Sequence, residues 1–110
     1  MSSGSTDTVF KITDDGTVSV FMDATGDGAG HALDRPGSID ADVNGNVYVA
    51  GVVSNNAFKI TPSGVITQLI DQTGDGKPNH TLSGPPGIAV DPQGNVFVTS
   101  LHNRAFKISP

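Results

Sequence analysis

The sequence predicts an all-β repeat protein, and three observations support this fold class. Apolar residues fall in short runs that alternate with polar residues, which is the period of two that a sheet strand needs. The motif Phe-Lys-Ile followed by Thr or Ser occurs at residues 10–13, 58–61 and 106–109, so its copies start 48 residues apart (10, 58, 106). All 11 acidic residues are Asp and 14 residues are Gly, a composition that disfavours long helices.

The pattern predicts nine strands along the chain. Turns rich in Asp, Asn, Pro and Gly separate neighbouring runs, as at residues 14–16, 43–46, 62–64 and 91–95. The first six expected strands cover residues 8–13, 17–22, 38–42, 47–51, 57–61 and 65–70, and three more lie within residues 87–108. Two long Gly- and Asp-rich loops, at 23–35 and 71–84, follow the second and sixth strands.

The repeats run from about residue 10 to 57 and from 58 to 105, with a partial third at 106–110. The long loops repeat as well, since Asp-x-Thr-Gly-Asp-Gly occurs at 23–28 and again at 71–76. A period in the forties with four strands per repeat indicates the blade of a β-propeller, a ring of four-stranded antiparallel sheets. We therefore expect a two-blade propeller fragment over residues 7–110, preceded by a flexible leader at 1–6.

Residues 85–91 and 94–98, followed by Asn-Arg-Ala-Phe-Lys-Ile at 103–108, resemble the NHL-repeat β-propellers. The chain is also similar to the related streptogramin-lyase and gluconolactonase-like propellers, over nearly all of residues 7–110. The resemblance implies that the Gly-Ile-Ala-Val strand at 87–90 lines a central channel and that residues 65–70 form an outer edge. The acidic residue usual after the second strand of such a blade is replaced by Gly51 and Ser100. The close similarity of the two repeats also fits a designed, reconstructed or recently amplified propeller.

In family terms the chain carries strands three and four of one blade, a whole blade, and strands one to three of another. Two blades cannot close a ring, and open strand edges pair readily with other chains. We therefore expect homo-oligomers that close one ring about a rotational axis. Six blades are common in NHL-like rings, which favours a trimer over a dimer or tetramer. Residues 9–12 and 105–108 would then compete for one strand position, and the sequence leaves open which of them takes it.

The long loops are candidate calcium sites, because oxygen ligands at alternate positions followed by Gly can wrap a hard cation. The ligands would be Asp23, Thr25, Asp27 and Asp34 in the first loop and Asp71, Thr73 and Asp75 in the second. The alternative is turn chemistry, in which these side chains bond to nearby backbone amides while Gly takes positive φ. No cofactor other than calcium is expected.

Six residues that recur at the blade period are expected to form the apolar layers between blades. They are Phe10, Ile12, Phe58, Ile60, Phe106 and Ile108. Strand alternation places them on one face, with Lys11, Lys59 and Lys107 on the other.

Three functions are open. The first is a structural module that self-associates into a ring, with binding potential at its loops and channel mouth and no catalysis. The second is a metal-dependent lyase or lactonase-like propeller, with His31, His80 or His102 near the channel mouth. Lactonase-like propellers use a metal cage that includes Glu, and this chain has no Glu, so we expect no enzyme activity. The third is a calcium-stabilised extracellular propeller segment.

Charge and composition limit the kinds of partner that we expect. The formal net charge of −5 argues against nucleic acid, and no apolar run is long enough for a membrane span. The first five residues lack the charged and apolar regions of a secretory signal, and the absence of Cys excludes disulfides. The one partner expected is then a second copy of the same chain, which the open strand edges call for.

Overall fold

A computed structural model describes residues 8–23, 25–28, 30, 32–74, 76, 81–85, 87–101 and 104–109. Within these residues the chain forms nine strands and is all-β, as the sequence predicts. The strands are β1 (Val9–Ile12), β2 (Val18–Met22), β3 (Pro36–Ala41), β4 (Val47–Gly51), β5 (Asn56–Ile60), β6 (Ile66–Ile70), β7 (Ile88–Val90), β8 (Val96–Ser100) and β9 (Arg104–Ile108). The first six expected strands are confirmed to within two residues at each end. No described residues form a helix that could span a lipid bilayer.

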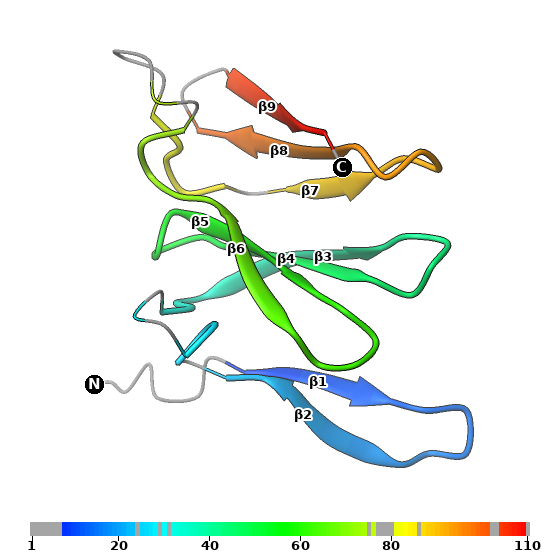
Figure 1. The fold of residues 1–110 in the computed structure, drawn as a ribbon. Coiled ribbons are helices and arrows are strands. Elements are labelled where there is room, and N and C mark those ends of the chain that lie inside the picture. The colour runs from blue at the N-terminus through cyan, green and yellow to red at the C-terminus, as the bar shows by residue number, and fades with distance from the viewer. Residues whose placement is uncertain are drawn as a thin grey trace.

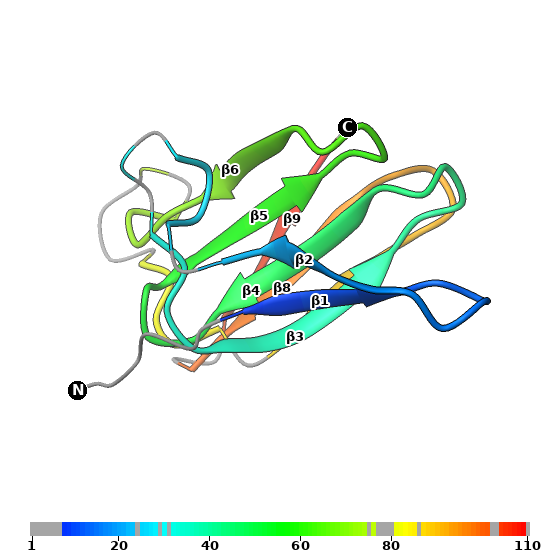
Figure 2. The same ribbon diagram turned by 90° about the horizontal axis from the view of Figure 1, so that it is seen from below.

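The strands form three antiparallel sheets that stack face to face (Figure 1). The first sheet is the hairpin β1–β2, the second is β3-β4-β5-β6 and the third is β7-β8-β9. Figure 2 looks along the stack and shows the hairpin lying across the four-stranded sheet. The middle sheet has four strands, the number expected for one repeat, and the outer sheets have two and three.

Two of the hairpin turns are held by an Asp at their start. Asp42 Oδ1 accepts hydrogen bonds from the backbone N–H groups of Asn44 and Asn46, at 2.9 and 3.0 Å. Asp91 Oδ1 accepts the equivalent bonds from Gln93 and Asn95, at 3.0 and 2.8 Å. Asn46 and Asn95 also donate from their side chains to the second carboxylate oxygen of Asp42 and Asp91, both at 2.9 Å. These turns fix the register of β3 with β4 and of β7 with β8.

The apolar core consists of two layers, one on each face of the middle sheet. Alternation along β4 sends Val49 toward the hairpin and Tyr48 and Ala50 toward the third sheet. The hairpin layer contains Val9, Met22, Leu33, Val49, Phe58 and Ile60. The other layer contains Tyr48, Ala50, Ala57, Ile70, Leu82, Ile88, Val96, Val98 and Phe106. Each layer is therefore a sheet-on-sheet contact between neighbouring sheets of the stack.

Polar contacts also join the second and third sheets. Ser38 Oγ accepts a hydrogen bond from Ile88 N at 3.2 Å, and Asp40 Oδ2 accepts one from Val90 N at 3.0 Å. Both donors are backbone groups of β7, which pairs with β8 alone among the described strands. Side chains of β3 thus satisfy N–H groups on the otherwise unpaired edge of β7.

Candidate functional site: an open face beside the N-terminal hairpin

Residues at equivalent positions of the two repeats differ sharply in exposure. Ile39 on β3 and Ile88 on β7 occupy the same position, since each pairs with the second Val of the next strand. Ile88 is 8% exposed because it packs on the middle sheet, whereas Ile39 is 55% exposed. No described sheet covers Ile39 in the way that the middle sheet covers Ile88. The face of β3 that carries Ile39 is therefore open.

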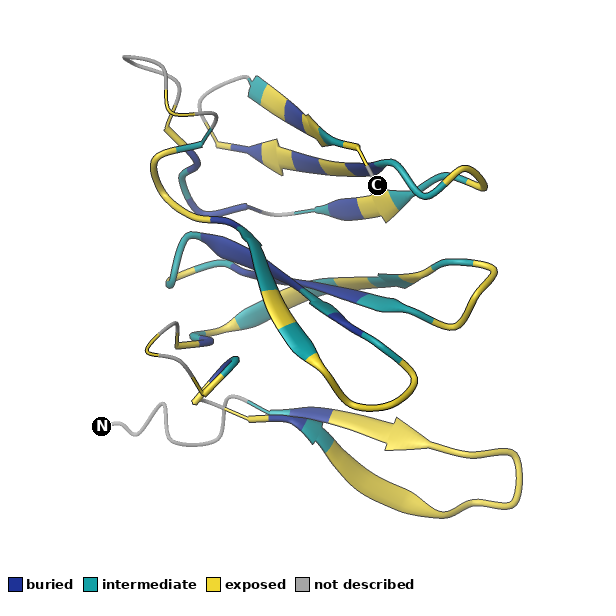
Figure 3. Ribbon diagram, in the orientation of Figure 1, coloured by how far each residue is buried: buried dark blue, intermediate teal, exposed yellow. Residues whose placement is uncertain are grey.

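The hairpin carries a second open face. The register pairs Phe10 with Val20 and Ile12 with Val18, so these four side chains lie on one face. Val9 and Met22 lie on the opposite face and are buried against the middle sheet. Phe10 is 59% exposed and the other three are more than half exposed. Figure 3 shows the part of the hairpin near its turn as exposed, with buried residues only at the start of β1 and the end of β2. Four neighbouring apolar side chains thus lack a covering layer in the described part of the chain.

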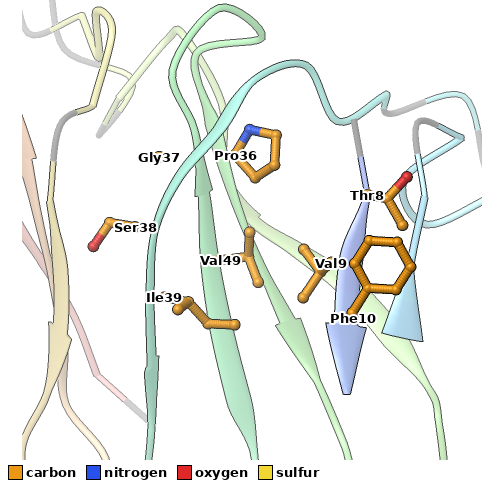
Figure 4. A pocket seen from close by; sticks show the side chains of 8 residues that line it. All are labelled: Thr8, Val9, Phe10, Pro36, Gly37, Ser38, Ile39 and Val49. Carbon is orange, nitrogen blue, oxygen red and sulfur yellow. The ribbon is translucent and has the colours of Figure 1, made fainter. Parts of the chain in front are cut away.

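A hollow of about 310 Å³ lies between the hairpin and the middle sheet. Figure 4 shows Val9 and Ile39 directed into this space from β1 and β3, while Ser38 is directed toward β7. A second hollow of about 470 Å³ adjoins it and is lined by Phe10, Phe21, Ile39, Val47 and Pro62, among others. The hollows are lined mainly by apolar side chains and by residues of β1, β3 and β4.

The strand edges beside these faces are also open. Among the described strands, β1 pairs with β2 alone and β9 pairs with β8 alone. In the middle sheet the equivalent strand β5 pairs on both sides, with β4 and β6. Backbone N–H and C=O groups on the free edges of β1 and β9 can therefore accept a further strand.

The structure divides the six predicted blade-packing residues. Phe58 and Ile60 are fully buried against the hairpin, Phe106 is buried against the middle sheet, and Ile108 is half-buried. For Phe10 and Ile12 the structure differs from the expectation, because both side chains are mostly exposed. The physical reason is that this face of each strand packs on the preceding sheet, and no described sheet precedes the hairpin. The three Lys residues lie on the opposite faces, with Lys11 Nζ 5.8 Å from the centre of the Phe21 ring.

The two predicted calcium loops adopt the same turn geometry. Asp23 Oδ1 accepts hydrogen bonds from Thr25 N, at 3.0 Å, and from Thr25 Oγ1. Asp71 Oδ1 accepts the equivalent bonds from Thr73 N, at 3.0 Å, and from Thr73 Oγ1. The side-chain bond from Thr25 is the main cause that lowers the pKa of Asp23. Local turn bonds therefore occupy one oxygen of each carboxylate.

The remaining predicted calcium ligands and the loop glycines also fit turn chemistry or lie outside the described residues. The glycines of the two Asp-x-Thr-Gly-Asp-Gly motifs take positive φ, between 63° and 85°, as turn chemistry requires (Gly26, Gly28, Gly74, Gly76). Asp34 lies at the end of its loop, where its backbone carbonyl accepts from Val53 N and Ser54 N. The structure brings no three His or Asp side chains together for a metal within its described ranges. Asp75, His31, His80 and His102 lie outside those ranges, so the calcium and channel-mouth hypotheses stay predictions.

The Asp-led turns predict a specific acid response. Hydrogen bonds, first those from Asn46 and Asn95, hold the pKa values of Asp42 and Asp91 below the ordinary Asp value. A group whose pKa is lower folded than unfolded stabilises the fold above its unfolded pKa, near pH 4. That contribution is lost as the pH falls through the folded pKa. We therefore expect the free energy of unfolding to decrease as the pH falls below about 4.

Urea unfolding between pH 6 and pH 2 measures this response. A variant with Asp42→Asn and Asp91→Asn should be less stable at pH 6 and show a shallower pH dependence below pH 4. The matched control, Asp14→Asn, removes one exposed carboxylate from the β1–β2 turn and should keep the wild-type slope. An unchanged slope in the double variant would contradict the role given to these two Asp residues.

The same Asp42 carboxylate accepts a hydrogen bond from the Tyr48 hydroxyl at 3.0 Å. Burial, this bond and the negative charge of Asp42 raise the pKa of Tyr48 to about 12.

The sequence did not indicate the residues that join the sheets. Ser38, Asp40 and Asn55 belong to no motif in the sequence. Each nevertheless accepts a hydrogen bond from a backbone N–H group of the next sheet or of the loop that precedes it. The buried Asn56 donates to Ala32 O at 2.9 Å and to Gln68 Oε1 at 3.1 Å, tying the first long loop to the sheet. One signal was present for Ser38 and Asp40. Their partners in the second repeat are Gly87 and Ala89, so the first repeat alone places polar side chains on that strand face.

Comparison with known proteins extends the fold assignment. No protein-family model and no curated protein matches the chain. Among solved structures it is similar to a streptogramin B lyase, with a TM-score of 0.63 and 14% identity over 97% of this chain and 35% of that one. It is also similar to virginiamycin B lyase from Staphylococcus aureus, with a TM-score of 0.60 and 17% identity over 97% of this chain and 36% of that one.

A catalytically inactive virginiamycin B lyase from Staphylococcus aureus, solved with quinupristin, gives a TM-score of 0.54 and 16% identity over 100% of this chain and 43% of that one. The chain therefore spans roughly a third to two fifths of the length of these proteins. The streptogramin B lyase is a β-propeller, and the likeness shows a propeller-like fold for this chain. At these identities the likeness carries the fold alone.

Proposed function

We propose that this chain is a structural module, not an enzyme, whose copies assemble into a closed NHL-like β-propeller ring. The observation that carries the proposal is the contrast between Ile39 and Ile88, which occupy the same repeat position. Ile88 is buried against a neighbouring sheet, whereas Ile39 is exposed. In the proposed ring the cover for Ile39 is β7 and β8 of a second copy, placed against the open face of β3 and β4. Within one chain β3 and β4 already contact β7 through their opposite face, and the ring would repeat this kind of sheet-on-sheet contact one sheet further along.

The exposed surfaces of the third sheet support this pairing. Phe97 and Thr99 on β8 are exposed, on the face opposite to the buried Val96 and Val98. Alternation would direct them toward the hollow beside β1, β3 and β4 when a second copy is seated there. The Ile39 face of one copy and the Phe97 face of the other are then buried by one contact. Burial of apolar area is the main driving force for such association.

The proposed ring contains alternating blades. One kind is the middle sheet of a single chain, and the other combines β7 and β8 of one chain with the hairpin of the next. Three chains supply six blades, which the resemblance to NHL propellers favours over the four or eight blades of a dimer or tetramer. Loops at the ring faces would offer binding potential. The names of the similar lyases carry no activity over to this chain.

Light scattering and native mass spectrometry test the proposal. Wild-type chain at micromolar concentration should show about three times the chain mass of 11.2 kDa. Ile39→Asp places a charge on the open face and should leave a folded monomer, because an unpaired carboxylate is costly to bury. The control Val53→Asp changes a residue that is 51% exposed and lines neither hollow, and it should keep the wild-type mass. A folded wild-type monomer would overturn the proposal.

A further inference from the structure

We infer that assembly occurs by strand replacement, in which β1 of one copy takes the position that β9 of the next copy occupies in the single chain. This inference rests on the proposed function and names the surface and the partner. The occupant is the β1–β2 hairpin of a second copy, and the site is the edge of β8 together with the adjoining face of the middle sheet. In the isolated chain β9 covers that site.

The repeat shows that β1 and β9 are alternatives for one position. Phe10, Phe58 and Phe106 are 48 residues apart, and β1, β5 and β9 are the third strands of their sheets. In the third sheet, β8 pairs with β9 in the register Val98 to Phe106. In the middle sheet, β4 pairs with β5 in the equivalent register Val49 to Phe58. The edge of β8 therefore accepts one strand with this sequence pattern, and two are available.

Burial favours the hairpin. Phe10 in the position of Phe106 would pack on the partner's middle sheet, where Phe106 is buried now. Ile12, Val18 and Val20 lie on the same hairpin face and would be covered with it. Loss of β9 from this position exposes Phe106, which is buried, and Ile108, which is half-buried. The exchange covers four apolar side chains and uncovers two, so its net burial is favourable.

The hairpin also completes the sheet, which β9 does not. With β9 the third sheet has three strands and a free outer edge. With the hairpin it has four, because β2 follows β1 as β6 follows β5 in the middle sheet. The opposite hairpin face keeps its present contact, since Val9 and Met22 already pack on the middle sheet of their own chain. The composite sheet of β7 and β8 from one copy and β1 and β2 from the next thus uses two contacts that exist within a single chain. One is the contact of the hairpin with the middle sheet, and the other is the contact of the third sheet with the middle sheet.

A matched pair of variants at the equivalent positions tests the inference. Phe10→Ser and Phe106→Ser make the same change in the two strands, and light scattering over a dilution series reads the assembly. Phe10→Ser should give a folded monomer. Phe106→Ser should keep the assembled mass and lower the concentration for half-assembly on the order of tenfold, because the covering strand is weakened. The reverse result, with loss of assembly only in Phe106→Ser, would show that β9 stays and would overturn the inference.

A disulfide variant decides the question if Phe106→Ser fails to fold. Thr99 and Ala105 are directly paired across β8 and β9 and are both exposed, and the chain has no other Cys. Thr99→Cys with Ala105→Cys should be monomeric when oxidised and should assemble when reduced, because the bond holds β9 in place. Assembly of the oxidised form at the wild-type mass would overturn strand replacement while leaving the ring intact. A monomer in wild type and in both redox states would instead overturn the proposed function.

The reciprocal cross-link identifies the replacing strand. Val9 is the repeat equivalent of Ala105, so Val9→Cys with Thr99→Cys places the pair on different copies in the replaced arrangement. Oxidation should then give covalent multimers on a denaturing non-reducing gel. Monomers alone from an assembled sample would contradict the inference, since assembly would then have occurred without this contact.

Discussion

Phe58→Ala is expected to cost about 3–5 kcal/mol of the free energy of unfolding, the largest effect of any single truncation proposed for this chain. Phe58 is fully buried on β5, where it packs with Val9, Met22 and Val49 in the layer between the hairpin and the middle sheet. Removal of the ring leaves a cavity that strands fixed on both sides of β5 cannot close. Urea denaturation followed by circular dichroism measures the change.

The control for Phe58→Ala is Val43→Ala in the β3–β4 turn. Val43 is 79% exposed, so its truncation should change the free energy of unfolding by less than about 0.5 kcal/mol. A loss below about 1 kcal/mol in Phe58→Ala would show that the layer between the hairpin and the middle sheet does not form in solution. The hairpin would then be absent from the folded unit.

Gly51→Ser is expected to destabilise the fold by about 1–3 kcal/mol through overpacking. A Cβ atom at Gly51 would overlap Ser54 Oγ and would lie 2.7 Å from Asn56 Oδ1. These two atoms are themselves hydrogen-bonded at 2.7 Å, and Asn56 ties the first long loop to the sheet. Any side chain at this position must displace that half-buried polar pair, so thermal melting should show a clear fall in Tm.

The second repeat supplies the control for Gly51→Ser. Ser100 occupies the equivalent position, and its hydroxyl accepts from Ser83 N at 3.0 Å. Ser100→Gly should lose this bond and cost less, about 1 kcal/mol, because no close packing is disturbed. Equal Tm values for wild type and Gly51→Ser would contradict the packing that the structure shows. The same crowding disfavours a longer acidic side chain at Gly51.

The assembly proposal links these effects to concentration. Exposed Ile39 and Phe10 lie on faces whose equivalents are buried elsewhere in the chain, so their substitutions should alter mass more than monomer stability. Phe58 and Gly51 lie in contacts within one chain, and their substitutions should alter stability at every concentration. A dilution series therefore separates the two classes of residue.

The sequence by itself determined the strands, their order and the repeat. Alternation of apolar residues and the Asp- and Gly-rich turns are local signals, so residues such as Val96 and Asp91 predict a strand and a turn without tertiary contacts. The 48-residue spacing predicted the four-stranded unit, and the middle sheet β3-β4-β5-β6 has that organisation. These features depend on neighbours in the chain, which the sequence places directly.

Only the tertiary structure decided which faces are covered. Phe10, Phe58 and Phe106 share one motif, and their different exposures arise from which sheet lies beside each strand. Ser38 and Asp40 form the hydrogen bonds to β7 because the stacking of two sheets brings residues 50 positions apart together. Burial and contacts between sheets depend on groups distant in the sequence, and identical local motifs cannot specify them.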